Sequence, residues 1–472
     1  MNEALHSALA AQFGSRFSTS PSLREQHGQG EAWHALAAPD AVVNVATTDE
    51  VASVVRQCAA ADVPVIAYGA GTSLEGQLAA VQGGVSIDLS GMDRVLRVST
   101  EDLDCTVEAG VTREALNVHL RDQGLFFPVD PGANATIGGM AATRASGTNA
   151  VRYGTMREVV LSLKVVLPDG TVITTASRAR KSAAGYDLTR LFVGSEGTLG
   201  IITEVTLRLF GIPQAISSAV CSFDDVDAAV QAATMVTQFG IPVARMELMD
   251  AGLIRMTNIR FGLDLQVADT LAFEFHGSDA SVAEQAAQVA QIVADCGGVG
   301  FEAATDADTR NRLWKARHNA FYTVVGQREG ARGWSSDVCV PASALPDAIR
   351  HARLLLADCT LPAAILGHVG DGNFHIVFAL DVTSNEEIAD VSRINSALVE
   401  HAISVGGTCT GEHGIGIGKI GYLAKEFDAG AIGLMRALKN AVDPKGLMNP
   451  GKILPAASCG GPIHEPEQEA AQ

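Results

Sequence analysis

Two histidines flank a turn motif in residues 365–378, which read Ile-Leu-Gly-His-Val-Gly-Asp-Gly-Asn-Phe-His-Ile-Val-Phe. Apolar runs lie on both sides of Asp371-Gly372, a pair that is typical of two-residue type I′ turns. A hairpin with this turn makes His368 oppose His375 on one face of a sheet, with Cβ atoms about 4.5–5.5 Å apart. Two imidazoles at that separation can bind one divalent metal ion, Zn²⁺ or Mn²⁺.

A carboxylate and a third histidine follow in Gly-Glu-His-Gly, residues 411–414. Glu412 is the expected third metal ligand, because two histidines and one carboxylate leave coordination positions open, as a catalytic metal requires. His413 is the expected general base, since imidazole titrates near neutral pH. Two alternatives stay open: His413 could orient a ligand, or it could bind the metal with Glu412 outside the coordination shell.

Three segments rich in small residues could surround a long, flat ligand. The first, 64–76, follows a strand-like stretch and offers backbone N–H groups, Thr72 and Ser73 to anionic oxygens. Its glycine spacing is neither G-x-G-x-x-G nor that of a Walker loop, which disfavours a nicotinamide Rossmann site. The others are 129–147 and 194–202. A flavin dinucleotide with its pyrophosphate on the first loop fits these segments; glycines that merely pack in sheet corners are the alternative.

The surrounding elements indicate a mixed α+β chain rather than regular βαβ repeats. Hydrophobic spacing and turn residues set the expected elements. Helices are expected at 49–61, 112–123, 226–240, 280–296 and 307–325, and strands at 63–68, 85–89, 95–98, 106–108, 161–167, 172–175, 271–275 and 364–378. The pair 161–167 and 172–175 flanks Pro-Asp-Gly and is expected to form a hairpin.

The composition excludes several classes of protein. The chain has 472 residues, 53 acidic against 34 basic, and a net charge of −19 without a dense basic block, which argues against nucleic-acid binding. This length predicts at least two domains. No apolar run approaches the ~20 residues that span a bilayer, and the first residues do not resemble a signal peptide. We expect a cytoplasmic protein, or a peripheral one at the inner membrane if it delivers electrons there.

Taken in order, these motifs resemble the flavin domain of the vanillyl-alcohol-oxidase-like FAD flavoproteins. Residues 40–455 resemble their FAD-linked D-lactate, glycolate and D-2-hydroxyglutarate dehydrogenase branch. The matching motifs are Gly-Gly-Met-Ala-Ala-Thr, Gly-Ser-Glu-Gly-Thr-Leu-Gly, Gly-His-Val-Gly-Asp-Gly-Asn-Phe-His, Gly-Glu-His-Gly-Ile-Gly and Met-Asn-Pro-Gly-Lys. The stretch 335–341 resembles the D-lactate dehydrogenases of this branch most closely.

The resemblance implies an α+β fold of three parts. Residues 1–213 would form a two-subdomain FAD-binding domain of the vanillyl-alcohol-oxidase type. Residues 214–408 would form an α+β cap or substrate domain with the metal hairpin, and 409–472 would return to the FAD domain and the active site. The family places its divalent metal on the hairpin and Glu412 motifs. Some relatives attach FAD covalently through a histidine near the first loop; 64–76 contains none, so we expect non-covalent FAD.

The same resemblance assigns the FAD-binding residues to the three small-residue segments, to the stretch after the second one, and to a site near the C-terminus. These residues are Tyr68, Gly69, Ala70, Gly71, Thr72, Ser73, Pro131, Thr136, Gly138, Gly139, Ala142, Ser146, Gly147, Tyr153, Gly154, Glu196, Gly197, Gly200, Ile201, Ile202 and Asn449.

The activity implied is oxidation of a D-2-hydroxy acid, with D-lactate to pyruvate as the first candidate. His413 would remove the hydroxyl proton while flavin N5 accepts the C2 hydride. Arg317 aligns with the family's carboxylate-binding arginine, and its forked guanidinium suits a carboxylate. Relatives that oxidise 2-hydroxyglutarate carry Thr, Lys and Asn where this chain has Phe321, Ser335 and Val377, so a distal carboxylate would stay unpaired here. This favours a monocarboxylate.

Several partners and alternatives remain. Electrons would pass to an acceptor such as cytochrome c or a quinone, and a homodimer is one expected state. Within the class, the alternatives are a glycolate oxidase catalytic subunit and a D-2-hydroxyglutarate dehydrogenase. An oxidase that reduces O₂ directly is a further alternative, and outside the class stands a non-catalytic flavin- or metal-binding module.

Overall fold

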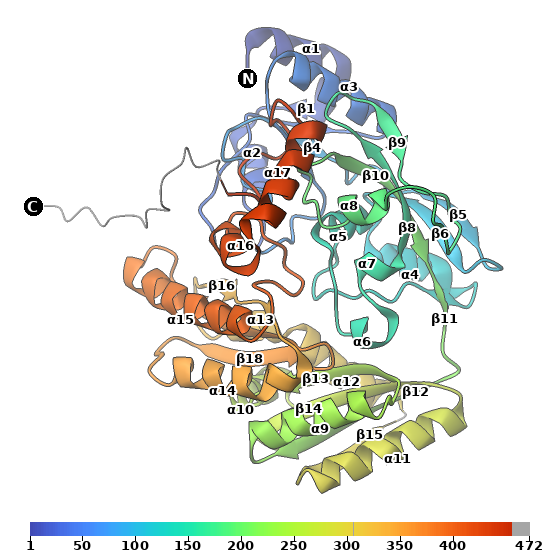
Figure 1. The fold of residues 1–472 in the computed structure, drawn as a ribbon, viewed down its shortest axis with the longest axis vertical. Helices are drawn as coiled ribbons and strands as arrows, with labels where there is room; N and C mark the ends of the chain where they lie inside the picture. The colour runs from blue at the N-terminus through green and yellow to red at the C-terminus, as the bar shows by residue number, and fades with distance from the viewer. Residues whose placement is uncertain (305, 456–472) are drawn as a thin grey trace, which may run out of the picture.

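The structure is a computed structural model that describes residues 1–304 and 306–455. Its strands form two sheets and a short strand pair in the N-terminal part of the chain, and one large sheet in the middle part (Figure 1). The N-terminal strands are β1 (Phe17–Ser18), β2 (Ala41–Asn44), β3 (Val65–Tyr68), β4 (Val85–Asp88), β5 (Val95–Ser99), β6 (Asp104–Glu108), β7 (Leu125–Phe126), β8 (Val160–Val166), β9 (Val172–Thr174), β10 (Ile201–Arg208) and β11 (Phe210–Gly211).

The first sheet has the strand order β1-β2-β4-β3, and β2, β4 and β3 are parallel. Helix α3 (Thr48–Ala60) connects β2 to β3, so this sheet contains one βαβ unit. Thr47 caps α3 by accepting a hydrogen bond from Glu50 N–H, and buried Val51, Val55 and Cys58 form its apolar stripe. The capping and periodicity that predicted this helix are confirmed.

The second sheet is antiparallel, with the order β5-β6-β10-β8-β9. The predicted hairpin is present: β8 pairs with β9, and Asp169 in the turn accepts a hydrogen bond from Thr171 N–H. The remaining N-terminal helices are α1 (Glu3–Phe13), α2 (Pro21–Gly28), α4 (Arg113–Arg121), α5 (Ile137–Thr143), α6 (Ala150–Tyr153), α7 (Met156–Val159) and α8 (Leu188–Phe192).

The large sheet has the order β15-β12-β14-β13-β18-β19-β16, with β17 also paired to β19. Helices α9, α11, α14 and α15 pack on one face, and α10, α12 and α13 pack on part of the other. The strands are β12 (Ala215–Phe223), β13 (Val243–Met249), β14 (Asp269–Gly277), β15 (Val299–Ala304), β16 (Arg332–Ser335), β17 (Val338–Cys339), β18 (Ala363–His368) and β19 (Asn373–Leu380); the helices are α9 (Val226–Gln238), α10 (Ala251–Phe261), α11 (Asp279–Asp295), α12 (Ala307–His318), α13 (Ala320–Val325), α14 (Leu345–Leu356) and α15 (Asn385–Ser404).

The hairpin of β18 and β19 differs from the prediction in its turn. His368 pairs with Asn373, and Leu366 pairs with His375, so residues 369–372 form a four-residue connection. The physical reason is a non-local hydrogen bond: Val340 N–H donates to the carbonyl of Gly372 and holds that residue beside β17. The predicted direct opposition of the two histidines is therefore wrong. Because the register is shifted by two residues, both side chains still lie on one face of the sheet.

The C-terminal segment returns to the first sheet. Helix α16 (Ile420–Glu426) contacts α15, with Ser396 Oγ 2.8 Å from Tyr422 OH. Helix α17 (Ala429–Val442) lies beside the N-terminal part of the molecule (Figure 1). Val65 N–H donates to Leu447 O, and Asn449 N–H donates to Val65 O. These bonds continue the first sheet beyond the edge of β3. Of the predicted segment 409–472, residues 456–472 lie outside the described residues.

The four-residue turn makes Gly372 sensitive to substitution. Its φ is +77°, and an added Cβ would lie 2.1 Å from Val340 O. We expect Gly372→Ala to lower the free energy of unfolding by more than about 1 kcal/mol, because strain and the collision act together. Thermal unfolding with Gly211→Ala as control checks this, since a Cβ at Gly211 meets no atom within 4 Å. Equal melting temperatures for the two variants would contradict the observed turn.

Candidate active site

One cavity, of about 280 Å³, is lined by residues of both the N-terminal part and the large sheet. The three small-residue segments contribute to its wall, together with Arg317, His368, His375, Glu412 and His413. Segments that lie hundreds of residues apart in the sequence therefore meet in one place. The structure brings every predicted catalytic and metal-binding residue to this cavity.

All the predicted cofactor-binding residues line this cavity except three. Ile201 and Ile202 are neighbours in β10, so their side chains point to opposite faces; Ile202 faces the cavity, and Ile201 lies in the core under the first sheet. Tyr153 points away and its hydroxyl bonds with His276 Nδ1 at 2.7 Å. Gly154 ends helix α6 with φ +82°. These three positions do not line the cavity, and their assignment to FAD stays a prediction.

The cavity wall suits a dinucleotide that contacts the main chain. A Cβ at Gly69 would lie 2.3 Å from Thr136 Oγ1, and one at Gly138 would lie 2.5 Å from Ala109 Cβ, so no larger residue fits there. No described residue accepts a hydrogen bond from the backbone N–H groups of residues 70–73. Adjacent free N–H groups in a turn bind anionic oxygens such as those of a pyrophosphate. The residues present therefore fit FAD.

His368, His375 and Glu412 converge as predicted, although the turn differs. The Nε2 atoms of the two histidines lie 3.2 and 3.3 Å from the same oxygen, Glu412 Oε1. The other ring nitrogens are held from behind: His368 Nδ1 contacts Glu247 at 2.7 Å, and His375 Nδ1 contacts the carbonyl of Ser336 at 3.1 Å. A carbonyl only accepts, so Nδ1 of His375 carries a proton and the Nε2 lone pair of the neutral ring faces Glu412.

This donor set fits a divalent cation. Metal-binding histidines usually donate their second ring N–H to a carboxylate or a carbonyl, which is the arrangement found here. Burial alone would raise the pKa of the Glu412 carboxyl, but His368 and His375 hold it below its usual value. The carboxylate is therefore ionised, as a metal ligand must be. Burial also lowers the pKa of His375, which favours its neutral form.

A fully buried carboxylate, Asp337, holds the Glu412 segment in place. Its Oδ2 accepts hydrogen bonds from the backbone N–H groups of Glu412 and His413, both at 2.9 Å, and from Thr410 Oγ1 at 2.7 Å. Its Oδ1 accepts a bond from Asn373 Nδ2 at the start of β19. Asp337 thus ties the candidate base and the candidate ligand to the hairpin.

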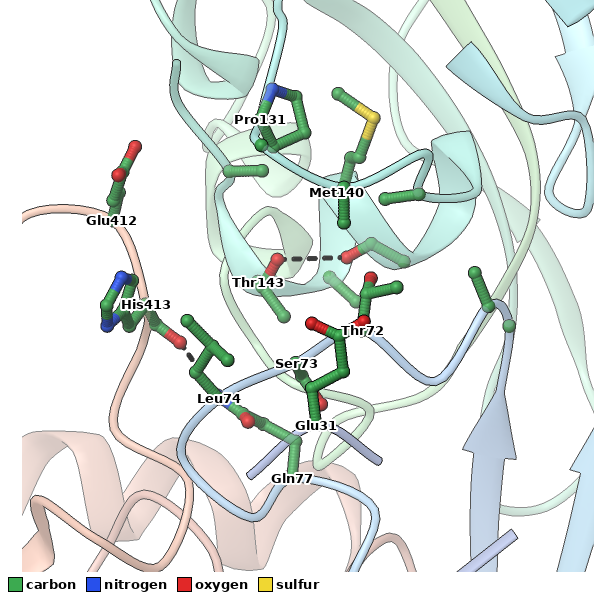
Figure 2. Close-up of a pocket in the computed structure, with 18 of the residues that line it drawn as sticks. Glu31, Thr72, Ser73, Leu74, Gln77, Pro131, Met140, Thr143, Glu412 and His413 are labelled. Atoms are coloured by element: carbon green, nitrogen blue, oxygen red, sulfur yellow. Dashed lines mark hydrogen bonds between the residues drawn. The ribbon is translucent and has the colours of Figure 1, made fainter. Parts of the chain in front are cut away.

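His413 lies between the two halves of the site. Its ring stacks on His375 with centroids 5.1 Å apart, and its Nδ1 lies 3.6 Å from Glu75 Oε1. Gln77 donates a side-chain hydrogen bond to the carbonyl of His413, which fixes the segment of Glu412 beside the loop of Ser73 (Figure 2). Burial would lower the pKa of His413, but Asp337 and Glu75 outweigh it and raise the pKa.

Arg317 projects from the last turn of α12 into the same cavity and is 6% exposed. Its NH2 group pairs with Glu247 Oε2 at 2.5 Å, while its Nε–H has no partner among the described residues. A buried donor without a partner is costly unless a ligand satisfies it. This guanidinium is therefore suited to donate a hydrogen bond to a carboxylate of a bound molecule.

The sequence reasoning missed Asp337 and Glu247. Glu247 lies in β13, whose sequence Val-Ala-Arg-Met-Glu-Leu-Met has two charged residues among apolar ones, and Asp337 lies between Ser336 and Val338. A carboxylate inside a buried strand is unusual and indicates a paired or functional group. That pattern was the available signal, but it does not identify the partners.

Two protein families match successive parts of this chain. The family described as "FAD binding domain" matches residues 39–176, and that described as "FAD linked oxidases, C-terminal domain" matches residues 212–453. Among solved structures, p-cresol methylhydroxylase with substrate bound aligns with a TM-score of 0.75 at 16% identity, covering 96% of this chain and 97% of that one. The fold is thus that of the vanillyl-alcohol-oxidase type of flavoprotein, as predicted.

Curated relatives place the chain more closely. It is 50% identical over 440 residues to "Probable D-lactate dehydrogenase, mitochondrial" of Danio rerio, covering 93% of this chain and 88% of that protein. It is 46% identical to "D-lactate dehydrogenase [cytochrome], mitochondrial" of Arabidopsis thaliana, covering 92% and 77%. It is 32% identical to "Glycolate oxidase subunit GlcD" of Bacillus subtilis, covering 88% and 89%.

The chain therefore belongs to the family of FAD-linked oxidases, which are flavin-dependent oxidoreductases. Two of these relatives carry names that place them in mitochondria, so a cytoplasmic location stays a prediction. Among the described residues, no helix combines the length and the apolar character that crossing a membrane requires.

The Asp337 contacts generate a prediction. In Asp337→Asn, an NH₂ group replaces one acceptor oxygen and faces N–H or O–H donors. We expect the free energy of unfolding to fall by about 1–3 kcal/mol and the rate of flavin reduction to fall as well, because Glu412 and His413 lose their anchor. Thermal unfolding of the FAD-bound protein and stopped-flow absorbance measure the two effects.

A matched control is Asp169→Asn, which removes one carboxylate from the exposed turn between β8 and β9. Its effect on stability should stay within about 0.5 kcal/mol. If Asp337→Asn behaves like this control in both measurements, Asp337 does not anchor the site.

Proposed function

We propose that the protein is an FAD- and divalent-metal-dependent dehydrogenase of D-2-hydroxy monocarboxylates, with D-lactate as the preferred substrate and pyruvate as its product. The observation that carries the proposal is the meeting of five groups in one cavity: His368, His375, Glu412, His413 and Arg317. They lie beside loops that fit a flavin dinucleotide. The names of the Danio rerio and Arabidopsis thaliana relatives support the same substrate.

Each of these residues has a separate role in the proposed reaction. Arg317 binds the substrate carboxylate through the donors that Glu247 leaves free. His368, His375 and Glu412 hold the divalent cation, Zn²⁺ or Mn²⁺, which lowers the pKa of a neighbouring hydroxyl when it is bound. His413 takes the hydroxyl proton. Bound FAD supplies the two-electron acceptor for the hydrogen on C2.

The far wall of the cavity favours a small substrate with one carboxylate. Phe321, Ser335 and Val377 all line the cavity, and Val377 is 2% exposed. Arg317 is the one arginine or lysine among the described residues of the lining. A second carboxylate would be buried without a cationic partner, which costs several kcal/mol. This argues for D-lactate over 2-hydroxyglutarate.

Glycolate is the second candidate substrate, because it also has one carboxylate and needs no methyl pocket. The Bacillus subtilis relative named as a glycolate oxidase subunit supports it. For the acceptor we propose a cytochrome or a quinone, in line with the word "cytochrome" in the name of the Arabidopsis thaliana relative. Peroxide release in air would point instead to an oxidase.

Anaerobic reduction of the bound flavin across a panel of acids tests the substrate. The panel contains D-lactate, L-lactate, glycolate, D-2-hydroxybutyrate and D-2-hydroxyglutarate. We expect D-lactate to bleach the flavin absorption fastest. D-2-hydroxyglutarate should be at least about tenfold slower, since one unpaired group costs about 1.4 kcal/mol or more. L-lactate should also be slower, because its C2 hydrogen and methyl group exchange places when the carboxylate and the hydroxyl bind at the same two points. Faster reduction by glycolate would select the second candidate, and no reduction by any acid would refute the proposal.

His413→Asn tests the base. The change removes the proton acceptor but keeps a polar side chain of similar reach. We expect flavin reduction by D-lactate to slow by roughly 10²–10⁴-fold, while the metal content and the bound FAD stay at the levels of the unaltered protein.

His401→Asn is the control, because His401 lies on α15 and pairs with Asp347 away from the cavity. Its reduction rate should equal that of the unaltered protein. A wild-type rate in His413→Asn would show that another group accepts the proton.

A further inference from the structure

We infer that Glu247 is a positioning residue that joins Arg317 to His368 and thereby sets the separation between the substrate carboxylate and the substrate hydroxyl. The inference rests on the proposed function, in which these two residues contact the two ends of a 2-hydroxy acid. Glu247 does not line the cavity. It acts through its two neighbours.

The sheet itself places Glu247 behind His368. Strands β13 and β18 are antiparallel, with Leu248 opposite Gly367 and Met249 opposite Leu366. One further step in this register brings Glu247 opposite His368, on the same face of the sheet. The side chain is completely buried, so water does not compete for its oxygens.

Each oxygen of this carboxylate faces a different group, one in a hydrogen bond and the other in an ion pair without hydrogen-bond geometry. Oε1 lies 2.7 Å from His368 Nδ1, and Oε2 lies 2.5 Å from Arg317 NH2. The first contact directs His368 Nε2 toward Glu412 Oε1, 3.2 Å away. The second contact holds one edge of the guanidinium and leaves its Nε–H free.

One rigid carboxylate therefore fixes both ends of the substrate site. A planar group about 2.2 Å wide between its oxygens, held by a strand, allows little independent movement of Arg317 and His368. In a 2-hydroxy acid the carboxylate and the hydroxyl are on adjacent carbons, whereas a 3-hydroxy acid places them one carbon further apart. Glu247 is therefore a determinant of selectivity for 2-hydroxy acids.

Glu247→Gln is the first test, because it keeps the shape but offers only one acceptor oxygen to two donors. The FAD-bound protein is stripped of metal and titrated with Mn²⁺ by electron paramagnetic resonance, which needs no turnover. We expect the Mn²⁺ affinity to fall by about 10–100-fold. We also expect KM for D-lactate to rise at least about tenfold, and the preference for D-2-hydroxybutyrate over D-3-hydroxybutyrate to fall.

Saturating Mn²⁺ distinguishes the effect of the contact between Glu247 and His368 from the effect of the contact between Glu247 and Arg317. If Glu247 joins both groups, excess Mn²⁺ restores kcat while KM stays raised, because the variant still lacks the ion pair that positions Arg317. Full recovery of KM would overturn the inference by showing that Glu247 supports His368 alone. An unchanged Mn²⁺ affinity would also overturn the inference, by showing that Glu247 does not support His368.

Two further variants separate this role from a general loss of structure. Glu274→Gln removes another buried, ion-paired carboxylate from the neighbouring strand β14, outside the cavity wall. It should lower the melting temperature but leave the Mn²⁺ affinity and the KM unchanged. Glu247→Asp keeps the charge but is too short to reach both partners, so it should weaken both readouts even if Glu247→Gln fails to fold. If D-lactate does not reduce the flavin of the unaltered protein, the proposed function is refuted. The Mn²⁺ titration would still test the contact between Glu247 and His368, because it needs no substrate.

Discussion

The structure of the site depends on buried carboxylates whose hydrogen-bond partners come from other segments of the chain. Asp337 has no exposed surface, and its oxygens accept hydrogen bonds from two segments that are distant from it in the sequence, the start of β19 and residues 410–413. A buried carboxylate is stable only with such partners, since water cannot replace them. The hairpin, strand β17 and the Glu412 segment must therefore meet before the charge can be buried. The site is therefore complete only when the hairpin of the large sheet is in place.

The two halves of the cavity use different chemistry. The N-terminal wall consists largely of glycine, alanine and small hydroxyl residues, and it offers main-chain N–H groups to a ligand. The opposite wall carries His368 and His375 on the hairpin of β18 and β19, Arg317 on α12, and Glu412 and His413 on the segment between α15 and α16. A large cofactor needs close approach along its length, whereas a small substrate needs a few strong contacts. Each half of the chain supplies one of these requirements.

The sequence predicted what depends on local patterns. Hydrophobic spacing and capping located α3, β3 and the hairpin of β8 and β9 to within a few residues. The alternation of side chains placed His368 and His375 on one face, but the pairing depended on the bond from Val340 N–H to Gly372 O, which no local pattern reveals. Motif resemblance assigned both Ile201 and Ile202 to the cofactor, whereas only Ile202 lines the cavity, because adjacent strand residues face opposite ways. Glu247 and Asp337 were missed because their roles exist only through distant partners.

The position of Arg317 explains how its positive charge can be buried when no ligand is bound. Its charge is balanced by Glu247, so the site without ligand contains an ion pair rather than a lone cation. The pair leaves the buried Nε–H of Arg317 without a partner among the described residues, and a carboxylate that approaches this edge could accept a hydrogen bond from it. A neutral ligand of the same size would leave that donor unpaired. In the proposed function, this donor favours a ligand with a carboxylate, and the buried side chain of Val377 favours a small apolar group on the rest of the ligand.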